Sequence, residues 1–443
     1  MSARAIGLAI AIAIAIVLCG GGRGAADPAP DPIDPIDADY NARSTGVAPP
    51  GETPPTHDKD AEADADADPP STGAVQGGVY ADSDRTTVWR TLGQLASSWG
   101  NWALNGRVGI DVVSSASIDV RTSPQLGAVD VVTSASGRSM SSGGQMTDTR
   151  YEVTGGGTWN DSHGHTAAIT ASAAHERDYD SVSGGWNGSI DVLDRTATIL
   201  AGLTLTDNRV SSVLDDAYHG KMFAAGWSGG VARVLTRDDA LRLRYDGRGA
   251  WGDQASPYRY VRFGDWNATT KSTGQIVFSN TIGSASGLPE KLPQERIAHA
   301  VVLEWVHALG DHVGLHPSVR LGHDSWGVDS VTGALDLRVV TSTARLELGY
   351  RYYRQGGASF FADKYTMDPS AYTSWTSDKE LGPQEGHLGE LGLGVVLHEP
   401  EGPGEARLLL ELHGDVFRYA YPGFALLPSR LSAFVSAGLT WEL

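Results

Sequence analysis

Charged side chains occupy every second position of several otherwise apolar segments, and they are the residues best placed to act on a solute. In ALRLRYDGRGAW (240–251) and ARLELGYRYYR (344–354), arginines and carboxylates alternate with leucines and tyrosines. Such a row, on one face of a strand, can steer an anion or can pair internally and fill the available space. The sequence leaves both alternatives open. The row comprises Arg242, Arg244, Asp246, Arg248, Arg320, Arg345, Glu347, Arg351, Arg407, Glu411 and Asp415.

Two histidine motifs could carry other chemistry. His163 and His165 could share a metal ion, but they fall in a predicted turn with no third ligand nearby, so a solvated turn is the better interpretation. His323, Asp324 and Ser325 are the residue types of a hydrolase triad, but residues adjacent in the chain rarely meet in triad geometry. We therefore expect no catalytic residue, metal or cofactor. A hydrolase built on a β-barrel stays open as an alternative function.

The elements that position the charged row are strands. From residue 103 onward, apolar residues recur with period two, which is typical of strands with one apolar and one polar face. Short turns near 160–163, 193–195, 236–239, 309–311, 340–342 and 399–404 mostly alternate with long connections, as in outer-membrane barrels. We predict an all-β fold, a transmembrane antiparallel barrel of about fourteen strands (12–16), over residues 103–443. The longest connection, 253–295, could fold inward as a constriction or extend as a hairpin.

A soluble sandwich could also bury one apolar face, so the period alone does not decide between the two classes. Four features favour the membrane barrel: the export signal, a mature chain without cysteines, the alternating loops and the last strand. In that strand, FVSAGLTWEL, the alternating apolar residues resemble the signal that barrel-assembly machinery reads, although the chain ends on leucine where phenylalanine is usual. The residues of this signal are Val435, Leu439, Trp441 and Leu443.

Aromatic residues near the ends of the predicted strands indicate a girdle at the membrane interface. The girdle is predicted from Trp251, Tyr258, Tyr260, Tyr350, Tyr352, Tyr353 and Trp441.

The first 102 residues divide into three segments. Residues 1–26 form a signal peptide with an apolar core at 5–18, and the single cysteine, Cys19, is a weak match to a lipid anchor. Residues 27–78 hold 12 Asp and Glu against 2 Lys and Arg, and ten prolines, so a disordered acidic tail is expected. Residues 79–102 are predicted as a lead-in with an amphipathic helix at 84–98, because Val88, Leu92, Leu95 and Trp99 recur at helical spacing.

Several stretches resemble a family of predicted outer-membrane proteins known as domain of unknown function 3570 (DUF3570). They are DVVSSASIDV (111–120), its echo DVVTSAS (130–136), SPYRYV (256–261), LPQERIAHAV (292–301) and YRYYRQGGASFF (350–361). The resemblance covers about residues 105–443. It departs from the family after Arg354, where acidic residues and a tryptophan are usual and Gln355, Gly356 and Gly357 stand here. It implies a barrel in a Gram-negative outer membrane, but no activity and no functional residue.

These observations predict a narrow solute channel or transporter with a charged lumen, in the outer membrane, with the acidic tail in the periplasm. The alternative is a structural or surface-interaction barrel whose lumen is blocked. The expected partners are outer-membrane lipid, the barrel-assembly machinery and a small solute. The net charge of −19 excludes nucleic acid as a partner.

Overall fold

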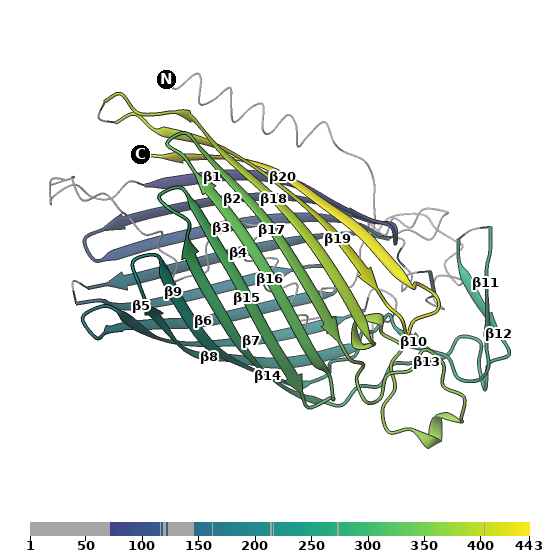
Figure 1. The fold of residues 1–443 in the computed structure, drawn as a ribbon. Coiled ribbons are helices and arrows are strands. Elements are labelled where there is room, and N and C mark those ends of the chain that lie inside the picture. The colour runs from purple at the N-terminus through teal and green to yellow at the C-terminus, as the bar shows by residue number, and fades with distance from the viewer. Residues whose placement is uncertain are drawn as a thin grey trace.

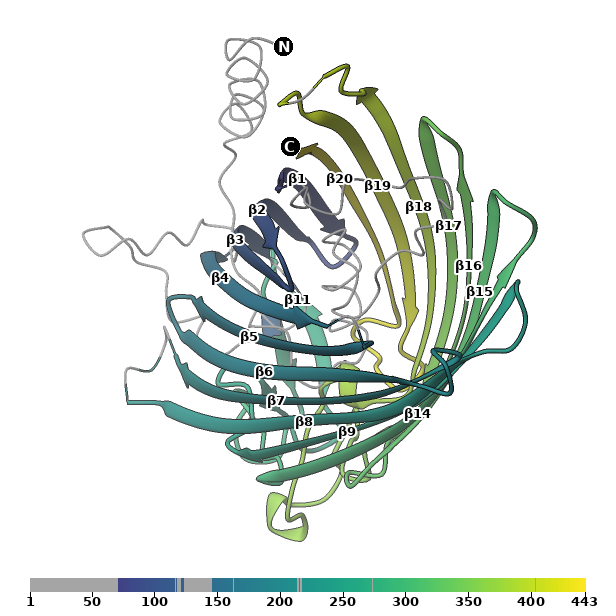
Figure 2. The same cartoon turned by 90° about the vertical axis from the view of Figure 1, so that its left-hand side faces the viewer.

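The computed structural model describes residues 71–443 except 116, 118–120, 123–145, 162, 213–214, 216, 273 and 403. Its main element is a closed antiparallel barrel of sixteen strands, in which each strand pairs with the next one along the chain (Figures 1 and 2). The strands are β1 Thr72–Asp82, β2 Thr86–Trp99, β3 Trp102–Ser115, β4 Met146–Asn160, β5 His165–His175, β6 Tyr179–Val192, β7 Ala197–Ser211, β8 His219–Val234, β9 Asp239–Gly252, β14 Glu295–Ala308, β15 Val313–Asp324, β16 Asp329–Val340, β17 Ala344–Gln355, β18 Gln384–His398, β19 Arg407–Ala420 and β20 Ser429–Glu442.

The barrel closes where β20 pairs with β1. Eleven residue pairs join the two strands, from Thr72 opposite Glu442 to Asp82 opposite Ser432. The backbone N–H of Leu443 also donates to the Ser71 carbonyl at 2.8 Å. Closure leaves no free sheet edge, so the backbone of every strand finds its partners within the wall.

The predicted helix at 84–98 is wrong, because these residues form the strand β2. Leu92 is buried on the inner face, whereas Leu95 and Trp99 are exposed on the outer face, as period two requires. The helical spacing of the apolar residues is a coincidence of sequence, and pairing with β1 and β3 decides the outcome. The barrel therefore starts at Thr72, and its sixteen strands lie at the upper end of the predicted range.

The boundaries predicted for the N-terminal segments change accordingly. Residues 72–78 of the predicted tail belong to β1, and the lead-in 79–102 is barrel wall. The signal peptide, Cys19 and residues 27–70 lie outside the described residues. No helix in the described part of the chain is long and apolar enough to cross a membrane.

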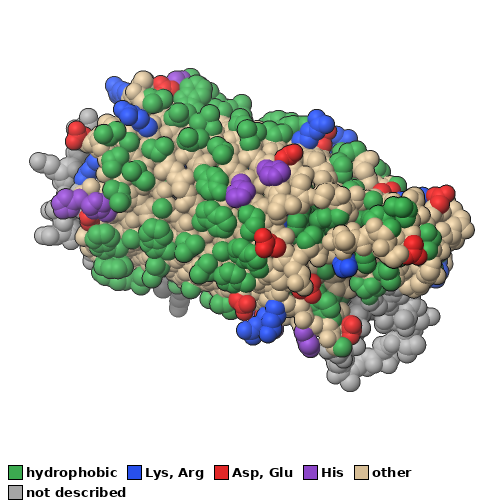
Figure 3. Space-filling model, turned by 90° about the horizontal axis from the view of Figure 1, so that it is seen from below, with side chains coloured by type: hydrophobic (Ala, Val, Ile, Leu, Met, Phe, Trp, Pro, Cys, Tyr) green, Lys and Arg blue, Asp and Glu red, His purple; other side chains and the backbone are tan. Residues whose placement is uncertain are grey.

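The outer face of the barrel is apolar. Leucine, valine, isoleucine and aromatic side chains are exposed at alternate positions of nearly every strand, with Leu243, Val301, Leu321, Leu391 and Val435 between 48% and 63% exposed. Figure 3 shows this apolar coverage on one face of the molecule, with few charged side chains among it. An exposed apolar surface of this extent is unstable in water and is suited to lipid.

The connections sort onto the two ends of the barrel as predicted. The end where β1 begins and β20 ends, called here the terminus end, has short turns: 100–101, 161–164, 193–196, 235–238, 309–312, 341–343 and 399–406. The opposite end, called here the loop end, carries the long connections together with the short turns 83–85, 176–178 and 325–328. Its elements outside the barrel wall are β10 Tyr260–Val261, β11 Asn267–Thr270, β12 Ile276–Ser279, β13 Leu288–Pro289 and the 3-10 helices η2 Pro369–Ala371 and η3 Lys379–Leu381.

Candidate functional site in the barrel interior

Ion pairs run across the inner face of β9, β14 and β15. Arg242 pairs with Glu304 on the neighbouring strand, where Nη2 lies 2.8 Å from Oε1. Asp246 is held between Arg244 at 3.0 Å and Arg320 at 2.6 Å. Since Leu241, Leu243 and Tyr245 face outward between these residues, the alternation in the sequence places the charges in the lumen.

A second group of inward charges spans β16 to β20. Glu347 lies between Arg338 at 2.7 Å and Arg345 at 3.5 Å. Arg345 also approaches Glu411 at 3.5 Å. Arg407 contacts Glu399 at 3.1 Å and Glu442 at 3.4 Å, close to the terminus end. The remaining members of the predicted row, Arg248, Arg351 and Asp415, lie on the inner face of their strands.

The structure adds charged residues that the sequence analysis missed. Arg90 pairs with Asp111, and Arg107 with Glu152, so the inner faces of β2, β3 and β4 are also charged. Arg296 and Asp324 form a buried pair on β14 and β15, with Nη2 and Oδ2 2.6 Å apart. Each of these charged residues lies at an inward position between the outward-facing positions of its strand. This alternation could have identified them from the sequence.

A cavity of about 360 Å³ lies within the barrel, among these charges. Four arginines contribute to its wall: Arg244, Arg248, Arg296 and Arg320. Three carboxylates accompany them: Asp246, Asp324 and Glu380. The cavity is therefore large enough for a small solute and is lined by groups that recognise charge.

Three loops form a cap over the loop end, and the name loop cap is used here for residues 253–294, 356–383 and 421–428. The first two are joined by paired backbone hydrogen bonds between Lys291 and Trp375. Arg259 of the first loop also contacts Asp378 of the second at 2.5 Å. Burial raises the pKa of Asp378, and Arg259 opposes this shift. The cap is thus held together by a buried ion pair.

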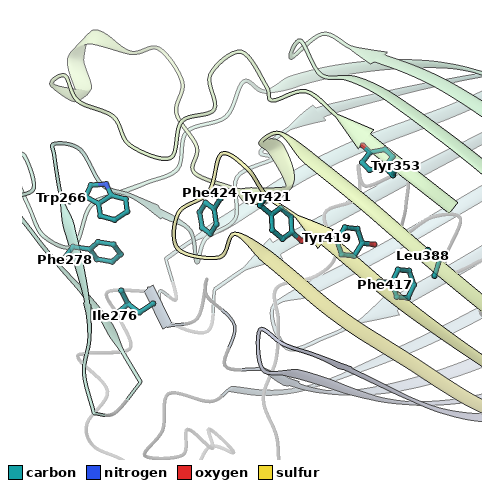
Figure 4. Close-up of a cluster of buried hydrophobic side chains, with 9 residues drawn as sticks. All are labelled: Trp266, Ile276, Phe278, Tyr353, Leu388, Phe417, Tyr419, Tyr421 and Phe424. Carbon is teal, nitrogen blue, oxygen red and sulfur yellow. The ribbon is translucent and has the colours of Figure 1, made fainter. Parts of the chain in front are cut away.

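The barrel wall and the loop cap share one apolar cluster, drawn in Figure 4. Tyr353, Leu388, Phe417 and Tyr419 point inward from the wall, and Tyr421 and Phe424 continue the row into the cap. The rings of Phe417, Tyr419 and Tyr421 are stacked in sequence, with centroids 6.1 and 6.3 Å apart. Part of the connection 253–295 forms the β11–β12 hairpin, and Ile276 and Phe278 of this hairpin, with Trp266 just before it, belong to the same cluster.

The predicted girdle divides into two sets. Tyr350 is half exposed on the outer face, and Trp251, Tyr352 and Trp441 occupy outward positions in their strands. Three other members need correction. Tyr353 is buried inside the barrel, because it follows Tyr352 directly and so faces the opposite way. Tyr258 is buried in the loop cap, and Tyr260 begins the two-residue strand β10 there.

Neither histidine motif forms the site that its residue types suggest. His163 and His165 follow Asp161 by two and four residues, and the Asp161 carboxylate accepts both of their backbone N–H groups at 2.9 and 2.8 Å, which is the arrangement of a capped turn. His323 faces outward to Asp329, whereas Asp324 faces inward to Arg296, so these two side chains lie on opposite faces of β15.

The residues Val435, Leu439, Trp441 and Leu443, predicted as an assembly signal, are at outward positions at the end of the chain, and Val435 is 63% exposed. Their accessibility suits recognition by another protein while the barrel is being closed, and that recognition stays a prediction.

The connection between β5 and β6 is expected to respond to pH. Burial raises the pKa of Glu176 to about 7; Arg150 opposes the shift, and Asp178 and Asp148 add to it. A carboxyl group whose pKa is higher in the folded state than in the unfolded state stabilises the fold fully at pH values below its pKa in the unfolded state. This stabilisation is lost as the pH rises through its pKa in the folded state. We expect slower hydrogen exchange in residues 176–179 at about pH 5 than at about pH 8, after correction for intrinsic rates. Glu176→Gln should reduce the difference to the part that Asp178 contributes, because burial also raises the pKa of Asp178. A variant that retained the full difference would exclude Glu176 as the cause.

Comparison with known proteins finds one matching family model and several solved structures of low sequence identity. The ferric enterobactin receptor PfeA of Pseudomonas aeruginosa is 13% identical and superposes with a TM-score of 0.40, over 80% of this chain and 54% of the receptor. The siderophore receptor PirA of Acinetobacter baumannii is 11% identical with a TM-score of 0.38, over 79% of this chain and 53% of the receptor. The monoaromatic hydrocarbon channel CymD is 8% identical and superposes with a TM-score of 0.37, over 85% of this chain and 89% of the channel.

The chain thus spans about half the length of these two receptors, and similarity at this level carries no argument about function. None of the curated proteins matches the sequence. The model of the family described as "Protein of unknown function (DUF3570)" matches residues 219–400. This range contains three of the recognised motifs, at 256–261, 292–301 and 350–361, and leaves out those at 111–120 and 130–136. The match from β8 through β18 confirms the predicted resemblance to the DUF3570 family.

Proposed function

We propose that this protein is an outer-membrane channel or transporter for a small anionic solute. The observation that supports this proposal is the charged cavity in the barrel interior, where four arginines meet three carboxylates. Preorganised arginines in a low-dielectric lumen attract and orient anions. The apolar outer face suits the outer membrane of a Gram-negative bacterium, with the terminus end and the acidic tail in the periplasm.

The experiment is a conductance measurement on the refolded full-length chain in a planar bilayer. We expect ohmic current with a preference for anions, read from the reversal potential in a salt gradient. Arg244→Gln should lower the anion preference, because it removes a lumen charge while Asp246 keeps Arg320 at 2.6 Å. Arg237→Gln, in an exposed turn at the terminus end, is the matched control and should leave the preference unchanged.

If the barrel is folded, as heat-modifiable migration in gel electrophoresis would show, and still carries no current, the channel proposal is rejected. The second candidate, a structural or surface-interaction barrel with a blocked lumen, would then be favoured. The observation that supports this candidate is the loop cap, whose apolar cluster reaches from the mouth into the lumen.

A further inference from the structure

Three carboxylates lie in one row across the inner wall, with only a glycine among them. Asp336 on β16 is opposite Gly349 on β17, Gly349 is opposite Glu390 on β18, and Glu390 is opposite Asp415 on β19. All four positions face the lumen. A Cβ added at Gly349 would lie 2.6 Å from Glu390 Oε2 and 3.1 Å from Asp336 Oδ1, so both carboxylates reach over the glycine.

Few basic side chains accompany this row. Arg351 lies two residues from Gly349 on the same strand face, and His316 Nδ1 on β15 lies 3.8 Å from Asp336 Oδ2, so one guanidinium and one imidazole stand beside three carboxylates. On the other side of the row, Arg338 is already matched by Glu347 at 2.7 Å. Like charges placed directly opposite one another in a sheet repel and destabilise it, so a bound cation would stabilise this row.

His413 supplies a nitrogen ligand at the same place. It precedes Asp415 by two residues on the same face of β19. The residue opposite it, Gly392, has no side chain, and Glu347 reaches over this glycine toward His413. Ligand atoms of Glu390, His413 and Asp415 all lie within 4.8 Å of one another. The three side chains therefore converge from two adjacent strands.

The carboxylate of Asp415 gives an independent indication of a ligand. Its side chain is 1% exposed, and the contact of Oδ1 is an ion pair with His413 Nε2 at 2.8 Å, with no hydrogen bond to this oxygen among the described residues. A buried carboxylate oxygen without a hydrogen bond is costly, and that cost disappears when a cation binds it.

We propose that Glu390, His413 and Asp415 form a binding site for a divalent transition-metal cation in the lumen wall, a site that the sequence did not predict. One imidazole and two carboxylates match the ligand preferences of Zn²⁺ better than the all-oxygen sets of Ca²⁺ or Mg²⁺. Zn²⁺ places its ligands about 2.0–2.2 Å away, hence roughly 3.3 Å from one another, so the present geometry needs only small shifts. Three protein ligands leave a fourth position open to the lumen, as in sites that exchange their bound group.

The test is calorimetric titration of ZnCl₂ into the tag-free, refolded full-length chain in detergent micelles, after treatment with EDTA. One Zn²⁺ should bind per chain, and excess Mg²⁺ should not displace it. Glu390→Gln and Asp415→Asn should each weaken binding by about tenfold or more. His163→Gln, at an exposed turn, is the control and should bind as the unmodified chain does. Absence of binding, displacement by Mg²⁺, or equal weakening by His163→Gln would each overturn the proposal.

Thermal unfolding separates a metal ligand from a merely structural carboxylate. In EDTA, Glu390→Gln should unfold at the same temperature as the unmodified chain or higher, because it relieves the repulsion within the row. With Zn²⁺, the unmodified chain should gain stability and Glu390→Gln should not. A lower unfolding temperature for Glu390→Gln in EDTA would identify a structural ion-pair role instead. This site does not rest on the proposed channel function, since metal binding in micelles is measured without conduction.

Discussion

Replacing Arg259 with methionine is expected to open the loop cap. Arg259 joins two loops by contacting Asp378 at 2.5 Å and Glu380 at 3.6 Å, and Asp378 is almost completely buried. Removal of one partner leaves a buried carboxylate without its counter-charge, which costs about 3–5 kcal/mol. The variant destabilises the closed loop cap by this amount, so the equilibrium constant for its opening should rise roughly a hundredfold or more. The barrel wall should stay folded, because its strands do not depend on this pair.

Limited trypsin digestion and conductance check this prediction together. Cleavage within residues 356–383 should accelerate, and single-channel current should increase if the loop cap restricts passage. Arg209→Met is the matched control, since Arg209 pairs with Asp207 where both side chains are more than half exposed. An exposed pair contributes about 0–1 kcal/mol, so this variant should behave as the unmodified chain does. Equal protection of the loop in Arg259→Met would show that the backbone and apolar contacts hold the cap without the ion pair.

Asp324→Ala is expected to destabilise the barrel by about 3–5 kcal/mol. The Asp324 carboxylate contacts Arg296 Nη2 at 2.6 Å and Nε at 2.7 Å. It also accepts the backbone N–H groups of Trp326 and Val328 at 2.9 and 3.0 Å, which fixes the turn between β15 and β16. The alanine variant would therefore leave Arg296 buried without its counter-charge and would leave two backbone donors unsatisfied.

Urea unfolding in lipid vesicles, followed by tryptophan fluorescence, measures this loss of stability. Asp329→Ala is the control from the same hairpin: Asp329 pairs with His323, with side chains 82% and 63% exposed, so its loss should cost less than about 1 kcal/mol. The double variant Arg296→Met with Asp324→Ala should recover part of the stability, because it removes the unpaired charge. Similar losses in Asp324→Ala and Asp329→Ala would contradict a role for burial.

The barrel itself could be predicted from local patterns. Period two in strands such as 240–251 and the alternation of short and long connections depend only on neighbouring residues, so they identified the wall, the inward charges and the two ends. The same reasoning failed at residues 84–98. There, Leu92, Leu95 and Trp99 satisfy the helical period, whereas in the strand Leu92 faces inward and Leu95 and Trp99 face outward. The pairing with β1 and β3, which joins residues outside this segment, decides for the strand.

What the sequence by itself determined is which face of each predicted strand is apolar, because side-chain direction along a strand alternates whatever the strand's partners are. What only the tertiary structure decided is which inward residues meet. The Arg259–Asp378 pair joins two loops that are far apart in the chain and meet in the loop cap. The Asp336–Gly349–Glu390–Asp415 row joins four strands, and cross-strand register places its residues together. Register depends on the closure of the whole sheet, so no local pattern contains it.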